Sequence, residues 1–320
     1  MAGVEMRYRR FEPLGRDLSV LALGTAYLAD DGEEASFELL DAWLAHSGNL
    51  IDSARQYGDG RSEAILGRWL ADRGVHDDVV LITKGGHHVT LGAQHDPERK
   101  RVTPEHLAAD LAESLEALGV DSIDLYFLHR DDPSKPVGPL VDALNDHAAA
   151  GRIRFFGGSN WTTERLEEAN AYAAFHGLQG FAVSSPGLSL AEPRAEPWPG
   201  TVFARSPEDR AWYRRMQLPL FAWSAQAGGF FAGRRDAETE RVYGGERNLE
   251  LLRRAEALAR ERGASANEVA LAWVLHQPFP TYAIIGPRTL AELEASIAAL
   301  EVELTPEDVR RLDLDEEEEP

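Results

Sequence analysis

The sequence predicts an α/β fold, namely a (β/α)8 barrel of the TIM type. Two observations carry this prediction: short apolar strands alternate with helix-like stretches along almost the whole chain, and eight such strands are present. Several strands are apolar on both faces, as parallel strands covered by helices are. The strand candidates are Val20–Thr25, Leu50–Ala54, Val79–Lys84, Asp124–His129, Ile153–Ser159, Phe181–Ser185, Leu220–Ala225 and Tyr282–Gly286.

An open, doubly wound parallel sheet is the alternative fold. Such a sheet often carries a Gly-x-Gly-x-x-Gly segment directly after an early strand, where it binds a dinucleotide. This sequence has no such segment in that position, which favours the barrel.

The stretches between the strands have the spacing of amphipathic helices. One of them starts after Thr103, whose side chain can cap the helix, and Pro104 suits the first helical turn. Leucines then recur every three or four residues until Gly119, a residue typical of a helix end. The same spacing predicts helices at Glu34–His46, Ser62–Arg73, Val137–Ala150 and Thr163–His176.

Three segments fall outside a plain barrel. A short β-hairpin is predicted for Met6–Ser19, before the first barrel strand, where it can close the N-terminal mouth of the barrel. Long loops are predicted after strands six and seven, at Pro186–Arg215 and Gln226–Arg247. Both lie on the face where barrel enzymes have their active sites. We expect residues 1–312 to form one catalytic barrel domain and residues 313–320 to form an acidic, disordered tail.

The composition narrows the function classes. A net charge of −21 argues against a nucleic-acid partner, because a surface that binds nucleic acid is basic. The chain has no run of about 18 apolar residues, and its N-terminus lacks the apolar core of a signal peptide. We therefore expect a cytoplasmic protein without a membrane span. The absence of cysteine excludes disulfides, thiolate metal sites and cysteine nucleophiles, whereas the oligomeric state stays open.

Four polar residues lie at or just after the ends of successive strands, and in a barrel these ends meet at one face. Lysine is scarce in this chain, and a buried ammonium is costly unless it is paired, so Lys84 at the end of an apolar strand indicates a function. Reduction of a carbonyl needs a proton donor, and Tyr57 can fill this role because a nearby ammonium lowers the pKa of a phenol. Asp52 can hold the lysine, and His129 can orient the carbonyl or relay a proton.

Longer segments around these residues resemble the aldo-keto reductase family, and the resemblance covers nearly the whole chain. The matching stretches, in the order of the family, are residues 49–54 with 57–67, residues 114–130 and residues 151–161. The resemblance implies an NAD(P)(H)-dependent oxidoreductase that transfers hydride between the nicotinamide and an aldehyde, ketone or sugar-derived carbonyl. Tyr57 is then the general acid/base, and Asp52, Lys84 and His129 complete the catalytic tetrad.

The same resemblance implies a set of cofactor contacts. Arg288 suits the 2′-phosphate of NADPH, so NADPH/NADP+ is the expected cofactor and NADH/NAD+ the alternative. Three positions depart from the family: Ser185 replaces a glutamine, Ser296 replaces an asparagine, and Glu292 stands where many members carry arginine or glutamine. An acid there repels a 2′-phosphate unless it points away. The implied contacts are Gly24, Thr25, Asp52, Ser159, Asn160, Ser185, Trp223, Gly286, Arg288, Thr289, Glu292 and Ser296.

The substrate is indicated only by aromatic residues in segments expected near the mouth of the barrel. Trp161, Trp198 and Phe230 are the predicted substrate contacts. Aromatic faces with polar neighbours suit a sugar-like carbonyl or alcohol, whereas the alternative is that the tryptophans only anchor long loops. No metal is expected, because the histidines after strand three lack a clear ligand spacing. These histidines are His87, His88 and His95.

Two other functions fit a barrel of this kind. A nicotinamide-nucleotide-binding regulatory subunit would bind the cofactor with little or no turnover, and it need not keep Tyr57 together with Lys84. A cofactor-independent isomerase or hydrolase would need paired carboxylates or metal ligands at the strand ends. The strand ends offer no second carboxylate of that kind beside Asp52, so an oxidoreductase is the expected function.

Overall fold

A computed structural model describes residues 4–30, 32–88 and 100–314, and within them the predicted (β/α)8 barrel is confirmed. Parallel strands close in chain order, and the last pairs with the first. Two strands, the second and the seventh of the barrel, end more than one residue earlier than predicted, because the chain leaves the barrel there to build loops. The barrel strands are β3 (Leu21–Gly24), β4 (Leu50–Asp52), β5 (Val80–Gly85), β6 (Ile123–Leu128), β7 (Ile153–Ser159), β8 (Val183–Ser185), β9 (Leu220–Ala222) and β10 (Thr281–Ile285).

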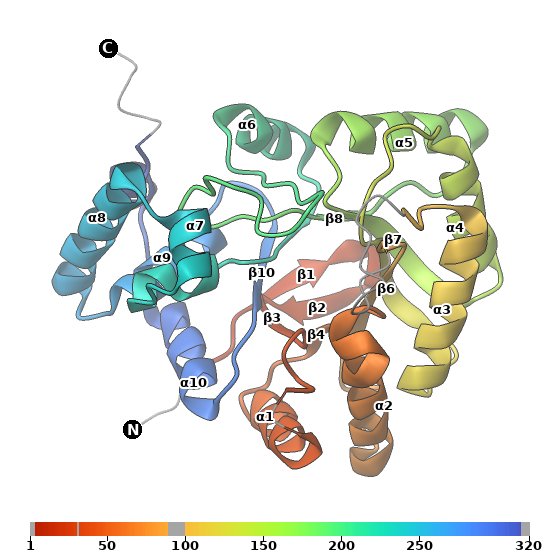
Figure 1. The fold of residues 1–320 in the computed structure, drawn as a ribbon, viewed down its shortest axis with the longest axis horizontal. Coiled ribbons are helices and arrows are strands. Elements are labelled where there is room, and N and C mark those ends of the chain that lie inside the picture. The colour runs from red at the N-terminus through yellow and green to blue at the C-terminus, as the bar shows by residue number, and fades with distance from the viewer. Residues whose placement is uncertain (1–3, 31, 89–99, 315–320) are drawn as a thin grey trace.

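Helices cover the outside of the barrel (Figure 1). The five helices predicted from spacing are present, each within one residue of its predicted bounds. They are α1 (Glu33–Ala45), α2 (Arg61–Arg73), α3 (Pro104–Leu118), α4 (Gly138–Ala149) and α5 (Thr163–His176). The later helices are α6 (Pro207–Met216), α7 (Ala237–Tyr243), α8 (Glu246–Arg262), α9 (Ala266–Leu275), α10 (Leu290–Ala298) and α11 (Pro306–Leu312). In the described part of the chain, no helix combines the length and the apolar character needed to cross a membrane.

The two ends of α3 show how the local sequence defines a helix. The hydroxyl of Thr103 accepts a hydrogen bond from the backbone N–H of His106, and Pro104 begins the helix. Gly119 follows its last residue with a φ of 67°, a left-handed conformation that glycine adopts without strain. Leu111 lies on the buried face between these ends, so the predicted cap, apolar face and stop are all confirmed.

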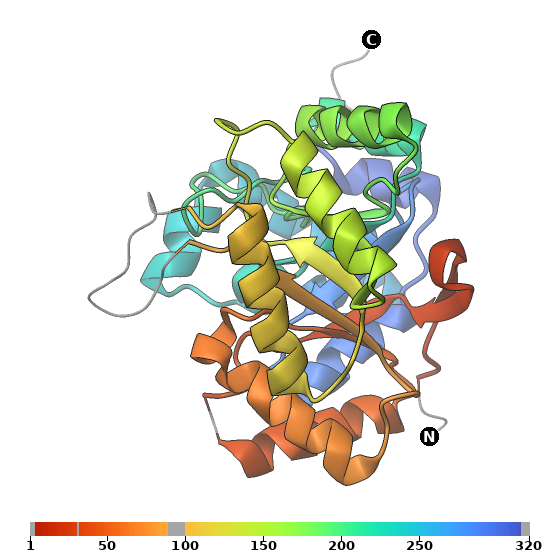
Figure 2. The same cartoon turned by 90° about the vertical axis from the view of Figure 1, so that its right-hand side faces the viewer.

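The N-terminal hairpin closes one end of the barrel, as predicted. Its strands β1 (Tyr8–Phe11) and β2 (Arg16–Ser19) pair antiparallel across a short 3-10 helix. Phe11 and Leu18 belong to the apolar cluster formed by the side chains inside the barrel, and Phe11 meets Tyr282 edge to face at 6.4 Å between ring centroids. Figure 2 shows the red hairpin at one end of the barrel and the cyan segment that carries α7 at the other.

The long segments after β8 and β9 lie where they were expected, but parts of them are helical. The end of the first segment folds as α6, where Pro207 begins the helix and the hydroxyl of Ser206 accepts a backbone N–H of the first turn. The second segment contains a 3-10 helix, then α7 with Asp236 as its cap, and then the start of α8. Side-chain caps are therefore the local signals that separate these helices from true loop.

The C-terminal boundary of the domain differs from the predicted one. Asp313 is fully buried, and its carboxylate binds the guanidinium groups of Arg205 and Arg210. Both guanidinium groups lie over a tryptophan ring of α9, at 5.0 and 5.8 Å from its centroid. Leu314 packs against the core. The folded domain therefore includes the first two residues of the predicted tail, because two buried cations hold the acid in place, and residues 315–320 lie outside the described residues.

Candidate active site

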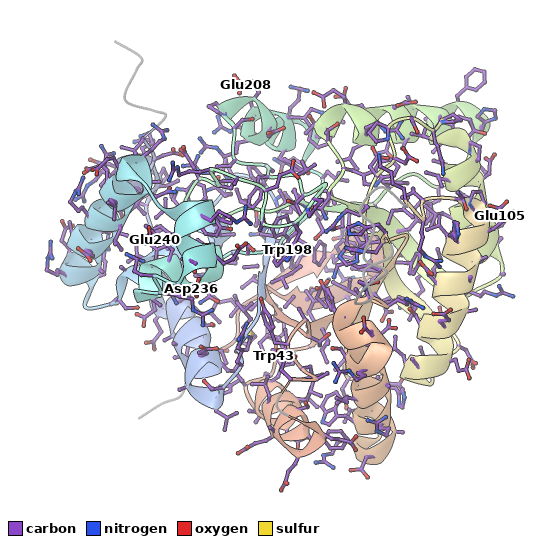
Figure 3. All side chains as sticks on the ribbon, viewed as in Figure 1. Trp43, Glu105, Trp198, Glu208, Asp236 and Glu240 are labelled. Atoms are coloured by element: carbon purple, nitrogen blue, oxygen red, sulfur yellow. The ribbon has the colours of Figure 1, made fainter. Side chains whose placement is uncertain are left out.

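A cavity of about 1010 Å³ opens at the C-terminal ends of the barrel strands, and all four residues of the predicted tetrad line it. Further walls come from the long segments after β8 and β9 and from the loop after β10. Figure 3 shows Trp198, one of the lining residues, near the centre of the view, whereas the acidic side chains of Glu105 and Glu208 lie on the outside. The tetrad therefore faces an open cavity that can hold a ligand.

Lys84 connects two other tetrad residues inside this cavity. Its Nζ donates to Oδ2 of Asp52 at 2.6 Å, to the carbonyl of Ser53 at 2.8 Å and to Oη of Tyr57 at 3.1 Å. Asp52 and Lys84 are both buried, and they come together because β4 and β5 are neighbouring parallel strands. The three donors of the ammonium are thus all engaged, which fixes its position.

Tyr57 reaches the lysine because the chain makes a tight turn after β4. Gly58, Asp59 and Gly60 have φ values of 56°, 58° and 84°, in the left-handed region that favours glycine. The turn directs the chain into α2 and leaves the tyrosine at the cavity wall. The Tyr-Gly-x-Gly spacing in the sequence is therefore a geometric requirement of the site.

Burial and charge act in opposite directions on the tyrosine. Burial raises the pKa of Tyr57 above its ordinary value, and the attraction to Lys84 only partly opposes this rise. The predicted lowering of the Tyr57 pKa is therefore wrong as a net shift. Burial lowers the pKa of Lys84, but Asp52 and Tyr57 outweigh it, so the lysine pKa lies above its ordinary value. Near neutral pH the site thus holds a protonated phenol beside an ammonium ion.

His129 follows β6 and faces the tyrosine. The rings of His129 and Tyr57 meet edge to face, with their centroids 5.7 Å apart. Burial is the main cause that lowers the pKa of His129 well below its ordinary value, and His87 and Arg130 add to this effect. The imidazole is therefore neutral near pH 7, and its Nδ1 is buried without a hydrogen-bond partner among the described residues. A neutral imidazole beside the phenol can orient a carbonyl.

Most of the predicted cofactor contacts line the cavity. At Gly24, an added Cβ would lie 2.9 Å from Cγ2 of Ile284, so glycine lets β3 and β10 approach closely here. Trp223 follows β9, and its Nε1 is buried without a partner among the described residues. The predicted contacts found in the cavity wall are Gly24, Asp52, Ser159, Asn160, Trp223, Gly286, Arg288, Glu292 and Ser296.

Ser159 and Asn160 lie in the wall with their side-chain donors already engaged. The Nδ2 atom of Asn160 donates to the carbonyl of His129 at 3.1 Å and to Oγ of Ser159 at 3.2 Å. Its Oδ1 accepts from the backbone N–H of Val202 at 3.1 Å. The serine hydroxyl donates to the carbonyl of Ser185 at 3.0 Å. Asn160 has a φ of 60°, so a strained residue joins β6, β7 and the segment before α6 around the cavity.

Three predicted cofactor contacts are not among the described residues that line the cavity. The hydroxyl of Thr25 donates to Oγ of Ser53 at 2.9 Å, and that of Ser185 donates to the carbonyl of Phe221 at 2.9 Å. Thr289 caps α10 by accepting a backbone N–H of its first turn. Each of these hydroxyls thus holds a strand or helix end, and direct contact of these three residues with the cofactor stays a prediction.

The loop after β10 places an arginine and a carboxylate side by side. The guanidinium of Arg288 lies 3.9 Å from the ring centroid of Tyr27, and both residues line the cavity. Oε2 of Glu292 accepts from the backbone N–H of Arg288 at 2.8 Å. Oε1 lies 3.9 Å from the guanidinium of Arg234. Glu292 thus does not point away from the site, and it places a negative charge at the start of α10.

The structure brings one of the three predicted substrate contacts to the cavity. Trp198 lines it, is 51% exposed, and has its ring 6.1 Å from that of Trp223. Trp161 is buried and donates from Nε1 to the carbonyl of Arg130, and Phe230 is fully buried in the core. The prediction of Trp161 and Phe230 as substrate contacts is therefore corrected: these large rings anchor the segments that carry them.

Other polar residues of the cavity wall were not predicted from the sequence. Arg130 directly follows His129, and its place beside a strand-end tetrad residue is a signal that points to it. The ring of His87 lies 4.6 Å from that of His129, although the sequence suggested only a metal role for it. Asn267 comes from α9, far from any strand end, and carries no local signal. His95, the third histidine of that segment, lies outside the described residues.

Known proteins resemble this chain along most of its length. The model of the aldo/keto reductase family matches residues 20–315. The uncharacterized oxidoreductase YrpG of Bacillus subtilis is 30% identical, over 96% of this chain and 95% of its own. The norsolorinic acid reductase stcV of Emericella nidulans is also 30% identical, over 96% of this chain and 80% of its own. A putative aryl-alcohol dehydrogenase of Saccharomyces cerevisiae is 28% identical, over 93% of this chain and 83% of its own. A crystal structure of the thermostable aldo-keto reductase Tm1743 with the inhibitor epalrestat shares the fold, with a TM-score of 0.74 at 22% identity over 96% of this chain and 99% of that chain.

Proposed function

The chain belongs to the aldo/keto reductase family, and we propose that it is an NAD(P)(H)-dependent enzyme with Tyr57 as its general acid/base. It would transfer hydride between the nicotinamide and an aldehyde, ketone or sugar-derived carbonyl. One observation carries the proposal: Lys84 donates to both Asp52 and Tyr57 at the wall of a cavity. A buried ammonium is costly, and its place beside a phenol is accounted for by proton transfer at that phenol.

Each tetrad residue has a separate role at the carbonyl of the substrate. The hydroxyl of Tyr57 donates its proton to the carbonyl oxygen as negative charge develops there. Lys84, 3.1 Å from that hydroxyl, stabilises the phenolate that remains, and Asp52 holds the ammonium in place. The neutral imidazole of His129 orients the carbonyl through a ring N–H. For an alcohol substrate the phenolate accepts the proton instead.

The cavity fits a nicotinamide dinucleotide in its size and in its polar groups. When bound, the nicotinamide supplies or accepts the hydride. Trp223 offers an indole face on which the nicotinamide ring can stack. The Oδ1 atom of Asn267 is a buried acceptor without a partner among the described residues, and an amino group of the cofactor would satisfy it. Gly286 and Arg288 would hold the phosphates, since both lie in the loop before α10.

NADP(H) is the cofactor that we favour, with NAD(H) as a weaker second. The guanidinium of Arg288 is held over Tyr27, where it can bind a 2′-phosphate with little loss of side-chain freedom. The carboxylate of Glu292, which accepts the backbone N–H of Arg288, opposes the phosphate charge, while Arg234 offsets part of that repulsion. The preference should therefore be modest in size.

The substrate class is narrowed by the aromatic wall. Trp198 and Trp223 give the cavity two indole rings, and one relative is named as a dehydrogenase of aryl alcohols. Aromatic aldehydes are therefore the first substrates to test. The case for a sugar-like substrate is weaker than the sequence indicated, because Trp161 and Phe230 lie outside the described lining of the cavity.

Consumption of NADPH and NADH with a panel of aldehydes tests the proposal. The wild-type protein should reduce at least one aromatic aldehyde, and Tyr57→Phe should bind the nucleotide but lose nearly all turnover. Nucleotide binding without any turnover by the wild-type protein would instead favour a regulatory subunit. Binding of neither nucleotide would contradict the oxidoreductase.

A further inference from the structure

We propose that Arg130 binds an acidic group of the substrate, so that the preferred substrates are aldehydes or ketones with a carboxylate or phosphate ester close to the carbonyl carbon. The inference rests on the proposed function, because it names the substrate class of the same site. It concerns a residue outside the tetrad and outside the predicted cofactor contacts. Its basis is a buried cation in the cavity wall that has no anionic partner among the described residues.

Arg130 is fixed beside the tetrad. It follows His129 at the end of β6, lines the cavity and is 8% exposed. Its Nη1 donates to the carbonyl of His129 at 2.8 Å, and its Nε donates to the carbonyl of Pro199 at 3.2 Å. The guanidinium is thus held between the catalytic strand end and the segment that carries Trp198, with its carbonyl partners on two sides.

The charge of this guanidinium is not balanced by an ion pair with any described residue. Burial lowers the pKa of Arg130 to about 10, and the attractions to Tyr57 and Glu196 offset burial only in part. Glu196 is exposed, and its carboxylate accepts the backbone N–H of Gly200 at 3.0 Å. Arg130 therefore stays charged near pH 7 without any described carboxylate in contact, and a buried cation without a counter-ion is costly.

Other buried guanidinium groups in this chain are paired. Arg205 binds Asp313 at 3.2 Å, and Arg210 binds the other oxygen of the same carboxylate. Both pairs are enclosed by protein rather than by the cavity. Arg130 differs because it lines the cavity, so a ligand that binds there can supply its counter-ion.

The charges of the tetrad residues around the carbonyl position cancel. Lys84 is paired with Asp52 at 2.6 Å, and His129 is neutral because its pKa is well below the ordinary value. Arg130 thus leaves a net positive charge at the tetrad end of the cavity, although the whole chain has a net charge of −21. A local positive site within an acidic protein selects for acidic ligands that can reach it.

The donors that remain suit a carboxylate near the reacting carbon. The Nη2 atom of Arg130 donates to no described residue, and it is accessible to solvent. Together with Nη1 it forms the edge of the guanidinium that binds a carboxylate through two parallel hydrogen bonds. Since Nη1 already contacts the backbone of His129, an acid held there places the rest of the ligand against the rings of His129 and Tyr57. A short spacing between acid and carbonyl therefore fits.

Steady-state reduction of matched aldehyde pairs tests this proposal. Ortho, meta and para carboxybenzaldehydes are compared with their methyl esters, and glyceraldehyde phosphate is compared with glyceraldehyde, which separates a carboxylate from a phosphate ester. The wild-type enzyme should have the higher kcat/KM for the acidic member of at least one pair. Arg130→Met should lower the acid-to-neutral ratio about 10- to 100-fold, because a charge-assisted hydrogen-bonded pair is lost. Arg130→Lys should keep part of the ratio.

A charge control and a binding measurement accompany the kinetics. Arg194→Met removes the same charge from an exposed position in the segment after β8, outside the described lining of the cavity, and should leave the ratio unchanged. Benzoate is titrated into the wild-type protein and Arg130→Met in the presence of NADP+, with tryptophan fluorescence as the readout. Benzoate affinity should fall in Arg130→Met and persist in Arg194→Met, while the circular dichroism spectra stay alike.

The outcomes separate the anion site from the proposed function. Equal ratios and equal benzoate affinity in the wild type and Arg130→Met would overturn the anion site, even if turnover stands. An equal loss for acidic and neutral aldehydes, with unchanged benzoate affinity, would also overturn it and leave Arg130 a positioning residue that acts through Pro199. If no aldehyde is reduced, the oxidoreductase fails, whereas benzoate binding that depends on Arg130 would still support the anion site.

Discussion

The Nζ atom of Lys84 lies 3.1 Å from the Oη atom of Tyr57, within hydrogen-bond reach and without any change of side-chain position. Asp52 holds the ammonium from its other side at 2.6 Å. Because burial raises the pKa of Tyr57, the phenol keeps its proton until charge develops on a substrate oxygen. Lys84 then stabilises the phenolate that is formed. The contact between Nζ of Lys84 and Oη of Tyr57 is thus favourable both before and after the tyrosine loses its proton.

Tyr57→Phe should remove proton transfer and keep the shape of the site. We expect kcat to fall about a hundredfold to ten-thousandfold, since the general acid is lost. NADPH affinity should stay close to that of the wild type, because the Lys84–Asp52 pair is retained. Tyr126→Phe is the matched control: its hydroxyl is buried outside the described lining of the cavity, and kcat should be unaffected. A kcat in Tyr57→Phe equal to that of the wild type would remove the tyrosine from its role.

The pH dependence of reduction should be flat through the neutral range. The pKa of His129 is lowered well below its ordinary value of about 6.5, which moves any acidic limb to lower pH. The pKa of Tyr57 is raised above about 10, so the proton needed for reduction is lost only in alkaline solution. The measurement is kcat/KM for a neutral aldehyde between about pH 5 and pH 10. A step near the ordinary histidine pKa that disappears in His129→Gln would contradict the neutral imidazole.

Arg288 and Glu292 should shift cofactor preference in opposite directions. Arg288→Ala removes the cation beside Tyr27 and should weaken NADPH binding about tenfold, with a smaller effect on NADH. Glu292→Gln keeps an acceptor for the backbone N–H of Arg288 but removes the negative charge, so it should strengthen NADPH relative to NADH. Fluorescence titrations with both nucleotides give the two ratios. An equal loss of both nucleotides in Arg288→Ala would exclude the 2′-phosphate role.

Asp313 should stabilise the fold more than an exposed acid of the same region does. Asp313→Asn removes the carboxylate that binds Arg205 and Arg210 in the core, and the free energy of unfolding should fall by about 3–5 kcal/mol. Glu261→Gln is the control, because its pair with Arg311 is half-exposed and should contribute less than about 1 kcal/mol. Urea unfolding measures both values. Equal and small losses in the free energy of unfolding for the two variants would contradict a stabilising role of Asp313.

Local signals were sufficient to predict which four polar residues meet in the cavity. Asp52 and Lys84 end apolar strands, and the glycines after Tyr57 set the turn that brings its hydroxyl to the lysine. Once a barrel is predicted, strand ends must converge, so the tetrad follows without knowledge of any long-range contact. The caps at Thr103 and Ser206 likewise mark the starts of helices in the local sequence.

Residues whose direction depends on distant partners could not be predicted in the same way. Trp161, Trp198 and Phe230 are all large rings in segments that follow barrel strands, yet only Trp198 among them faces the cavity, because the other two find apolar neighbours in the core. Asp313 looks like part of an acidic tail until Arg205, 108 residues earlier in the chain, is brought beside it. Periodicity identifies which elements form, but not which side chains meet across them.

Transfer of deuterium from the cofactor to the product tests the central claim most directly. NADPH carrying deuterium at the reactive ring carbon is incubated with the wild-type protein and a panel of aromatic, carboxylated and sugar-derived aldehydes, and the alcohols are examined by mass spectrometry. We predict deuterium on the former carbonyl carbon of at least one alcohol, and about a hundredfold less or lower still with Tyr57→Phe after the same time. Absence of labelled alcohol from every aldehyde, with both NADPH and NADH, would contradict hydride transfer at this site.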